Sequence, residues 1–328
     1  MFMSQFKQKR LTQLFIMGFM NILATSLVMF QFWIKKFKVN FSISMILTIK
    51  HVTEYTYDHP IKGLVQSTKL IPSEYEGIKI IEWDISMNSS DKGAIHTDFE
   101  GNNIQSFTNY EDLKKIKFTV SGKVETSDTS GVYRSKNDKI NELVYLRETK
   151  FTKKDTNIEN LALRARRLDE QTLLSPTGQP AVMNILKTAH NLLLLVADEV
   201  EYAPLTTNTS TTAAAAYKQK KGVCQDHAHI MIAAAKALGI PARYVNGYMH
   251  NNKNDSKYQA THAWAELYIN DLGWVGFDPT NRCCPDERYI RVSCGLDATY
   301  AAPIRGIVNG GTRENLDIDV QTLEVSAQ

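Results

Sequence analysis

Residues 222–248 read GVCQDHAHIMIAAAKALGIPARYVNGY, and this stretch decides the fold. A cysteine stands directly before an alanine-rich run of helical character, which Gly239 ends and Pro241 cannot continue. The next segment, ARYVNGYM, begins at Ala242 and has the apolar and aromatic composition of a strand. The stretch therefore predicts a helix that begins near the cysteine and leads directly into a sheet.

Residues 262–281, HAWAELYINDLGWVGFDPTN, predict a β-hairpin with NDLG as its turn. Alternation places His262, Trp264 and Glu266 on one face of the first strand. The opposite, core-facing side is expected to carry Ala263, Ala265, Leu267 and Ile269. His262 and Asp278 lie almost symmetrically about the turn, so we expect their side chains nearly opposite, roughly 5 Å apart.

Two more helices are predicted before this region. In NIENLALRARRLDEQ, apolar residues recur at helical spacing at Ile158, Leu161, Ala162, Ala165 and Leu168. The segment PAVMNILKTAHNLLLLVADEVEY opens with Pro180, a favoured residue at a helix start, and is long enough for about six turns.

From residue 46 to about residue 126 the pattern is that of β-structure. ILTIKHVTEYTYD, IKIIEWDISMN and KIKFTVSGKVET alternate apolar and polar residues, and short turn signals separate them. SDTSGVYRSKND, at 127–138, has no hydrophobic period and predicts a linker or surface loop. We therefore expect an α+β chain, with a β-rich N-terminal domain at 45–135 and a domain of helices and antiparallel strands at 136–328.

The first 44 residues differ from the rest. An apolar run at 11–34 is flanked on both sides by lysine and arginine, and it is about long enough to cross a bilayer. Three interpretations stay open: an uncleaved anchor, a signal peptide, or an upstream extension that is not translated. The protein is expected to be cytoplasmic if the chain starts near Met45, and membrane-anchored or exported otherwise. Only a real anchor at 11–34 would make a membrane its partner.

Charge and cysteine content narrow the classes of function. A net charge of +3 and the lack of a basic stripe with interleaved aromatics argue against a nucleic-acid partner. The four cysteines include no CxxC pair, and so few in 328 residues predict no disulfide framework. Cys283 or Cys284 could bond Cys294 in an oxidising compartment, whereas in a cytoplasm they would be thiols.

Cys224 has the surroundings of a nucleophile, although a buried structural cysteine is the alternative. The N-terminus of a helix favours the thiolate, and a nucleophilic cysteine needs a base with an orienting partner. His262 and Asp278 can supply both. A zinc site is disfavoured, because His227 and His229 would lie about 200° apart on a helix, so no metal is expected.

Residues around the predicted site are expected to have supporting roles. We expect Asp226 to cap the helix and His229 to pack or support the site. Trp264 and Trp274 are candidates for the walls of an apolar groove. The backbone N–H of Cys224 is one candidate donor to an oxyanion, and the second donor cannot be named from the sequence.

Four blocks in this order resemble the transglutaminase-like cysteine-enzyme superfamily in its bacterial form. They are G-V-C-x-D-x-A-H, G-I-P-A-R-Y-V-x-G-Y, H-A-W-x-E and G-W-x-x-F-D-P-T. The segment from Ile46 to about Glu125 is similar to the β-rich N-terminal region of these proteins, and the resemblance covers about 46–320. It implies a papain-like core with Cys224 as nucleophile, His262 as base and Asp278 as the orienting carboxylate.

The resemblance implies acyl transfer at an amide bond through a thioester, with no metal or organic cofactor. The partner would be a protein or peptide substrate. Water as acceptor gives a protease or amidase, the interpretation we favour, whereas a lysine amine gives a cross-linking transglutaminase. A non-catalytic binding or scaffold protein on the same fold is the alternative from another class. The sequence leaves the oligomeric state open.

Overall fold

The structure, a computed structural model, describes residues 44–135, 137–170, 184–251, 261–310 and 314–324. The predicted extension at 1–44 therefore lies outside the described residues, apart from its last residue, and so does the predicted helix start at Pro180. Within the described ranges no helix combines the length and the apolar character that crossing a bilayer requires.

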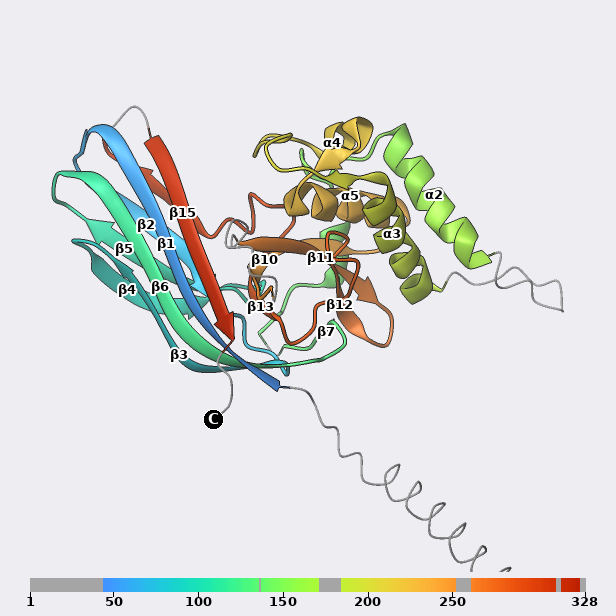
Figure 1. Cartoon of the computed structure of the whole chain (residues 1–328), viewed down its shortest axis with the longest axis horizontal. Coiled ribbons are helices and arrows are strands. Elements are labelled where there is room, and N and C mark those ends of the chain that lie inside the picture. The colour runs from blue at the N-terminus through green and yellow to red at the C-terminus, as the bar shows by residue number, and fades with distance from the viewer. Residues whose placement is uncertain (1–43, 136, 171–183, 252–260, 311–313, 325–328) are drawn as a thin grey trace, which may run out of the picture. The chain divides into compact units, whose positions relative to one another are not determined.

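The N-terminal part is built from β-strands, as predicted (Figure 1). Together with two strands from the C-terminal end they form two four-stranded sheets, in the orders β15-β1-β6-β3 and β14-β2-β5-β4. Both sheets contribute to one core, in which Phe107 of one sheet packs against Phe118 of the other with ring centroids 5.5 Å apart. The six N-terminal strands are β1 (Ser44–Ile61), β2 (Leu64–Ile71), β3 (Ile78–Met87), β4 (Asp91–Thr97), β5 (Asn103–Asn109) and β6 (Leu113–Ser127).

The last two strands pair with the N-terminal sheets. The sequence suggested a core domain at 136–328 that ends in a C-terminal strand and tail. In the structure β14 (Ile304–Val308) pairs with β2 and β15 (Glu314–Glu324) pairs with β1, both antiparallel. The physical reason is that β1 and β2 would otherwise be edge strands with unpaired backbone groups. The N-terminal sheets are completed by residues that follow the core in sequence.

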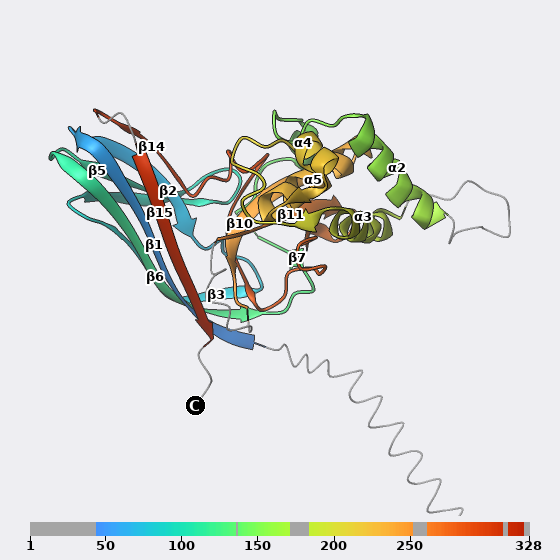
Figure 2. The same cartoon turned by 45° about the horizontal axis from the view of Figure 1, so that its top comes forward.

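The core combines helices with an antiparallel five-stranded sheet in the order β13-β10-β11-β12-β7, and the predicted α+β class is confirmed. The helices α2 to α5 gather on one side of this sheet (Figures 1 and 2). The sheet strands are β7 (Val132–Tyr133), β10 (Ala242–Met249), β11 (His262–Ile269), β12 (Gly273–Phe277) and β13 (Tyr289–Gly295). The remaining elements are η1 (Glu142–Leu146), α2 (Thr156–Glu170), α3 (Ile185–Glu199), β8 (Glu201–Tyr202), α4 (Ala213–Gln219), β9 (Lys221–Gly222) and α5 (Cys224–Ala237).

Two local expectations are corrected. The second predicted helix ends at Glu199 rather than near residue 202, because β8 follows and pairs with β9. The predicted linker at 127–138 contains β7, which covers the edge of β12 through the pairs Trp274 with Tyr133 and Val275 with Val132. A polar segment that lacks a hydrophobic period can therefore still contain two residues that pair with a strand of the sheet.

Both faces of β11 are buried. Ala263, Ala265 and Leu267 pack into the helical core, as the alternation predicts. On the other face Trp264 and Glu266 are each 2% exposed. Glu266 accepts hydrogen bonds from Arg243 Nε and Arg291 Nε, both at 2.7 Å. This buried ion network stiffens the sheet on which His262 stands.

Arg291 also connects the sheet to the N-terminal strands. Its Nη1 donates to Ser73 Oγ at 2.7 Å. Nearby, the Asn102 side chain donates to Cys294 O at 3.1 Å and accepts from Cys294 N at 2.7 Å. The five-stranded sheet is therefore held between the helices and residues of the β-rich region.

Candidate active site

Cys224 is the first residue of α5, and its position is fixed by the turn before it. Asp226 Oδ2 accepts from the Val223 N–H at 2.9 Å and from the Thr207 hydroxyl at 2.6 Å. A Cβ on Gly222 would lie 2.7 Å from the Cβ of Asp226, so this turn needs glycine. Asp226 thus has the predicted capping role, and Cys224 lies half-buried at the helix N-terminus.

His262 and Asp278 form a direct pair, with Nε2 and Oδ2 2.6 Å apart. Their geometry differs from the expected cross-strand pair. The ladder pairs Ala265 with Phe277, so Asp278, one residue past β12, is level with Trp264 rather than with His262. The turn is centred one residue later than we assumed, and the carboxylate reaches the imidazole diagonally.

Asp278 is held by more donors than the sequence suggested. Its Oδ1 accepts from the backbone N–H groups of Thr280 and Asn281 at 2.9 and 3.2 Å. Its Oδ2 accepts from Asn281 Nδ2 at 2.7 Å and from the Tyr289 hydroxyl at 2.8 Å, besides His262. Burial alone would raise the pKa of Asp278, but the His262 charge and these hydrogen bonds hold it below its usual value.

The imidazole of His262 favours its protonated form. Burial would lower the pKa of His262, but the Asp278 charge and hydrogen bond, together with a hydrogen bond and charge from Cys224, raise it to about 10. Because Nε2 faces Asp278, Nδ1 is the ring nitrogen left for the sulfur. His262 and Asp278 are therefore in direct contact, and Cys224 lies close enough to the imidazole to raise the pKa of His262.

The other two histidines near Cys224 are engaged elsewhere. His227 contacts Thr280 Oγ1 at 2.9 Å and Val200 O at 3.1 Å, and burial lowers its pKa. His229 is fully buried, accepts from the Ala298 N–H at 3.1 Å, and has a pKa lowered by burial to about 4. Among the described residues no three His, Cys, Asp or Glu side chains are grouped to hold a metal ion.

The remaining cysteines are free thiols, so the disulfide alternative is not formed. Cys294 is buried, with its sulfur 3.5 Å from Glu100 O, and Cys284 Sγ lies 3.8 Å from His190 Nε2. Trp264 and Trp274 do not share a groove. Trp264 lies beside His262, with ring centroids 6.2 Å apart, whereas Trp274 packs in a separate cluster.

Sequence reasoning missed the residues that hold Asp278. A partial signal was present, because Asp-Pro-Thr-Asn after a strand is the pattern of a turn in which the carboxylate accepts from N–H groups two and three residues on. Tyr289 carried no such signal. It reaches Asp278 from β13 and depends on the fold to do so.

Two protein families match the chain. The Transglutaminase-like superfamily matches residues 176–279, a range that contains Cys224, His262 and Asp278. The Bacterial transglutaminase-like N-terminal region matches residues 47–125, which correspond to β1–β6. The chain therefore carries a transglutaminase-like core and the bacterial transglutaminase-like N-terminal region.

Individual relatives cover different shares of the chain. Uncharacterized protein ML0607 of Mycobacterium leprae is 27% identical over 290 residues, 84% of this chain and 97% of that protein. Uncharacterized protein Rv2569c of Mycobacterium tuberculosis is 34% identical over 145 residues, 42% of this chain and 46% of that protein. A Protein-glutamine gamma-glutamyltransferase of Pseudomonas aeruginosa is 32% identical over 92 residues, only 13% of its length.

The fold is shared with a solved structure. A crystal structure of a "Putative Cysteine Protease" from Cytophaga hutchinsonii superimposes with a TM-score of 0.65. The likeness covers 88% of this chain and 93% of that one, at 19% sequence identity. The fold of most of this chain is therefore also that of the Cytophaga hutchinsonii protein.

Proposed function

We propose that this protein is a cysteine-dependent acyl-transfer enzyme that hydrolyses amide bonds of a protein or peptide substrate. Cys224 is the nucleophile, His262 the general acid and base, and Asp278 the orienting carboxylate. One observation carries the proposal, namely the buried His262–Asp278 pair, 2.6 Å from Nε2 to Oδ2, beside Cys224 at the N-terminus of α5.

The reaction follows from where the protons lie. In the reactive form the proton of the Cys224 thiol is already on Nδ1 of His262, since the imidazole favours its protonated form, and the sulfur attacks the substrate carbonyl. The oxygen that becomes negative can accept from the backbone N–H of Cys224, which the helix N-terminus leaves free of an intrahelical partner. His262 then gives its proton to the leaving amine as the carbon–nitrogen bond breaks, and a thioester stays on Cys224.

Water completes hydrolysis. His262 takes a proton from the attacking water, the carbon–sulfur bond breaks, and the acid is released as the sulfur regains its proton. Throughout this cycle Asp278 keeps the hydrogen on Nε2, so that Nδ1 stays directed at the sulfur. Tyr289 and Asn281 in turn hold the carboxylate in place.

Transfer to an amine is the second candidate, because one relative is named as a Protein-glutamine gamma-glutamyltransferase. In this reaction a lysine amine replaces water and an isopeptide bond forms. The thioester step is common to both reactions, so only the acceptor distinguishes them.

The deciding experiment offers a glutamine-containing peptide with and without an added primary amine, and identifies the products by mass. We expect free acid in both reactions if hydrolysis is the function. Amine adduct with little free acid would replace hydrolysis by transfer. Neither product, from protein whose Cys224 is intact, would contradict both.

A further inference from the structure

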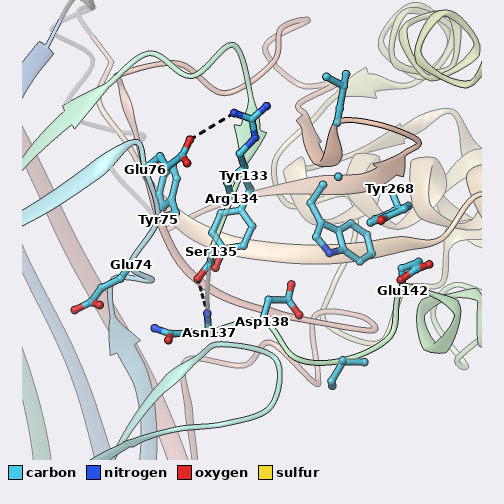
Figure 3. Close-up of a pocket in the computed structure, with 14 residues that line it drawn as sticks. Glu74, Tyr75, Glu76, Tyr133, Arg134, Ser135, Asn137, Asp138, Glu142 and Tyr268 are labelled. Atoms are coloured by element: carbon cyan, nitrogen blue, oxygen red, sulfur yellow. Dashed lines mark hydrogen bonds and ion pairs between the residues drawn. The ribbon is translucent and has the colours of Figure 1, made fainter.

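A cavity of about 680 Å³ lies apart from the candidate active site (Figure 3). It is lined by residues 74–76, by residues of the 133–142 segment and by the turn end of the β11–β12 hairpin, and none of the three candidate catalytic residues is part of its wall. Tyr268, in the wall, is six residues along β11 from His262, which corresponds to about 20 Å of strand. A small ligand held here would not touch the reacting sulfur.

Aromatic rings form the walls of this cavity. Tyr75 and Tyr133 pack together with ring centroids 5.2 Å apart, and Tyr268 and Trp274 do so at 5.4 Å. The Arg243 guanidinium lies 4.0 Å from the centroid of the Trp274 ring. The wall therefore offers aromatic surface for an aliphatic or cationic group.

The charge of the wall is negative. Four carboxylates line it, from Glu74, Glu76, Asp138 and Glu142, against the single cation of Arg134. Arg134 pairs with Glu76 at 3.6 Å. Glu74 and Glu142 have no basic partner among the residues that the structure describes. The cavity thus has unbalanced negative charge beside aromatic rings.

Asp138 points to the kind of ligand. Its side chain is only 9% exposed, and its Oδ2 pairs with Arg243, whose Nε in turn bonds Glu266. Its other oxygen, Oδ1, is buried and has no hydrogen-bond partner among the described residues. This oxygen has no surface toward the cavity, so Asp138 acts on a ligand through the negative charge it adds to the wall.

We propose that this cavity binds an alkylammonium group, the end of a lysine side chain presented by a peptide or protein. The ammonium donates to Glu142 on the same side of the cavity as Asp138, and its methylene stem lies along the paired rings of Tyr268 and Trp274 (Figure 3). This site goes beyond the proposed function, because it binds part of a partner chain away from Cys224. It would give the enzyme a preference for lysine at a fixed separation from the bond it cleaves.

The test measures binding of two small probes to the full chain by calorimetry. Nα-acetyl-lysine methylamide carries the ammonium, and Nα-acetyl-norleucine methylamide has a similar stem without the charge. We expect the lysine probe to bind at least about tenfold more tightly. Glu142→Gln is expected to weaken its binding about threefold to tenfold, and Asp138→Asn by less, since Asp138 acts through its charge alone. The control expected to be unchanged is Glu111→Gln, an exposed residue outside the cavity.

Several outcomes would overturn the proposal. Equal affinity for the two probes, no binding at millimolar concentration, or unchanged affinity in Glu142→Gln would each do so. Asp138→Asn removes a partner of buried Arg243, so the thermal unfolding of this variant is measured as well. If the Asp138→Asn protein does not fold, the Glu142→Gln variant decides the test. Saturating lysine probe is expected to leave iodoacetamide labelling of Cys224 unchanged, whereas protection of Cys224 would place the probe in the candidate active site instead. Since binding needs no turnover, its result is independent of the hydrolysis experiment.

Discussion

The Tyr289 hydroxyl donates to Asp278 Oδ2 at 2.8 Å, so the carboxylate that orients His262 is itself held by a residue of β13. The same oxygen also contacts His262 Nε2. The Tyr289 hydroxyl therefore acts on the proposed chemistry through Asp278, while the Tyr289 ring packs beside His262, with ring centroids 6.0 Å apart. The first prediction tests the role of the hydroxyl.

Replacing Tyr289 by phenylalanine removes one hydrogen bond to Asp278 and leaves the ring in place. We expect kcat to fall about fivefold with little change in KM, since a hydrogen bond of this kind is worth about 1 kcal/mol. The pKa of Asp278 should rise, so the acid limb of the pH–rate profile should move to higher pH. A change confined to KM, or an unmoved acid limb, would show that Tyr289 serves only packing.

The reactivity of Cys224 can be measured without a substrate. Positive charge on His262 and the helix N-terminus both favour attack by the sulfur, so iodoacetamide at neutral pH should label Cys224 faster than a free thiol. Cys224→Ala should remove the fast phase, and His262→Ala should slow it. Labelling no faster than a free thiol, with no effect of His262→Ala, would remove the basis of the enzyme proposal.

The charged state of His262 links stability to pH. The Asp278 charge outweighs burial and raises the folded-state pKa of His262 from 6.5 to about 10, so the native state binds this proton more tightly than the unfolded chain does. The resulting stabilisation is fully present below pH 6.5 and is lost as the pH rises through about 10. We expect the free energy of unfolding in urea to fall over this window, and to fall less in His262→Gln. Parallel curves for the two proteins would contradict this account.

Glu266 compensates two buried guanidinium groups, those of Arg243 and Arg291. Glu266→Gln should lower the free energy of unfolding by about 3–5 kcal/mol, because removal of one partner leaves buried charge uncompensated. The matched control is Glu125→Gln, whose pairing with Lys79 at 3.8 Å is largely exposed and should contribute less than about 1 kcal/mol. The free energy of unfolding of both variants is measured in denaturant. A similar decrease in the two variants would argue that the Glu266 ion network does not stabilise the protein.

The strands β14 and β15 are expected to be needed for solubility. A chain that ends at residue 303 exposes β1 and β2 as edge strands, which are prone to pair with other chains. We expect the truncated protein to aggregate, as judged by soluble yield and size-exclusion chromatography. A truncated protein that stays in solution with an unchanged melting temperature would show that the pairings are dispensable.

The parts of this structure that sequence could predict are those set by local rules. The helix from Cys224 follows from its glycine and proline boundaries, and the His262 hairpin follows from alternation around a turn. The pairing of β15 with β1 and the reach of Tyr289 to Asp278 could not be predicted in this way. They join residues far apart along the chain, and nothing local distinguishes these partners from others of similar character.

The return of β14 and β15 to the first two strands has a consequence for how the protein is made. During synthesis, β6 is available to pair with β1 long before residues 314–324 emerge from the ribosome. The other edge of β1 therefore stays unpaired while the whole core is synthesised. The core can acquire its helices and sheet during this time, whereas the N-terminal sheets close last. The emergence of residues 314–324, rather than the synthesis of the first six strands, is therefore the step that completes the β-rich region.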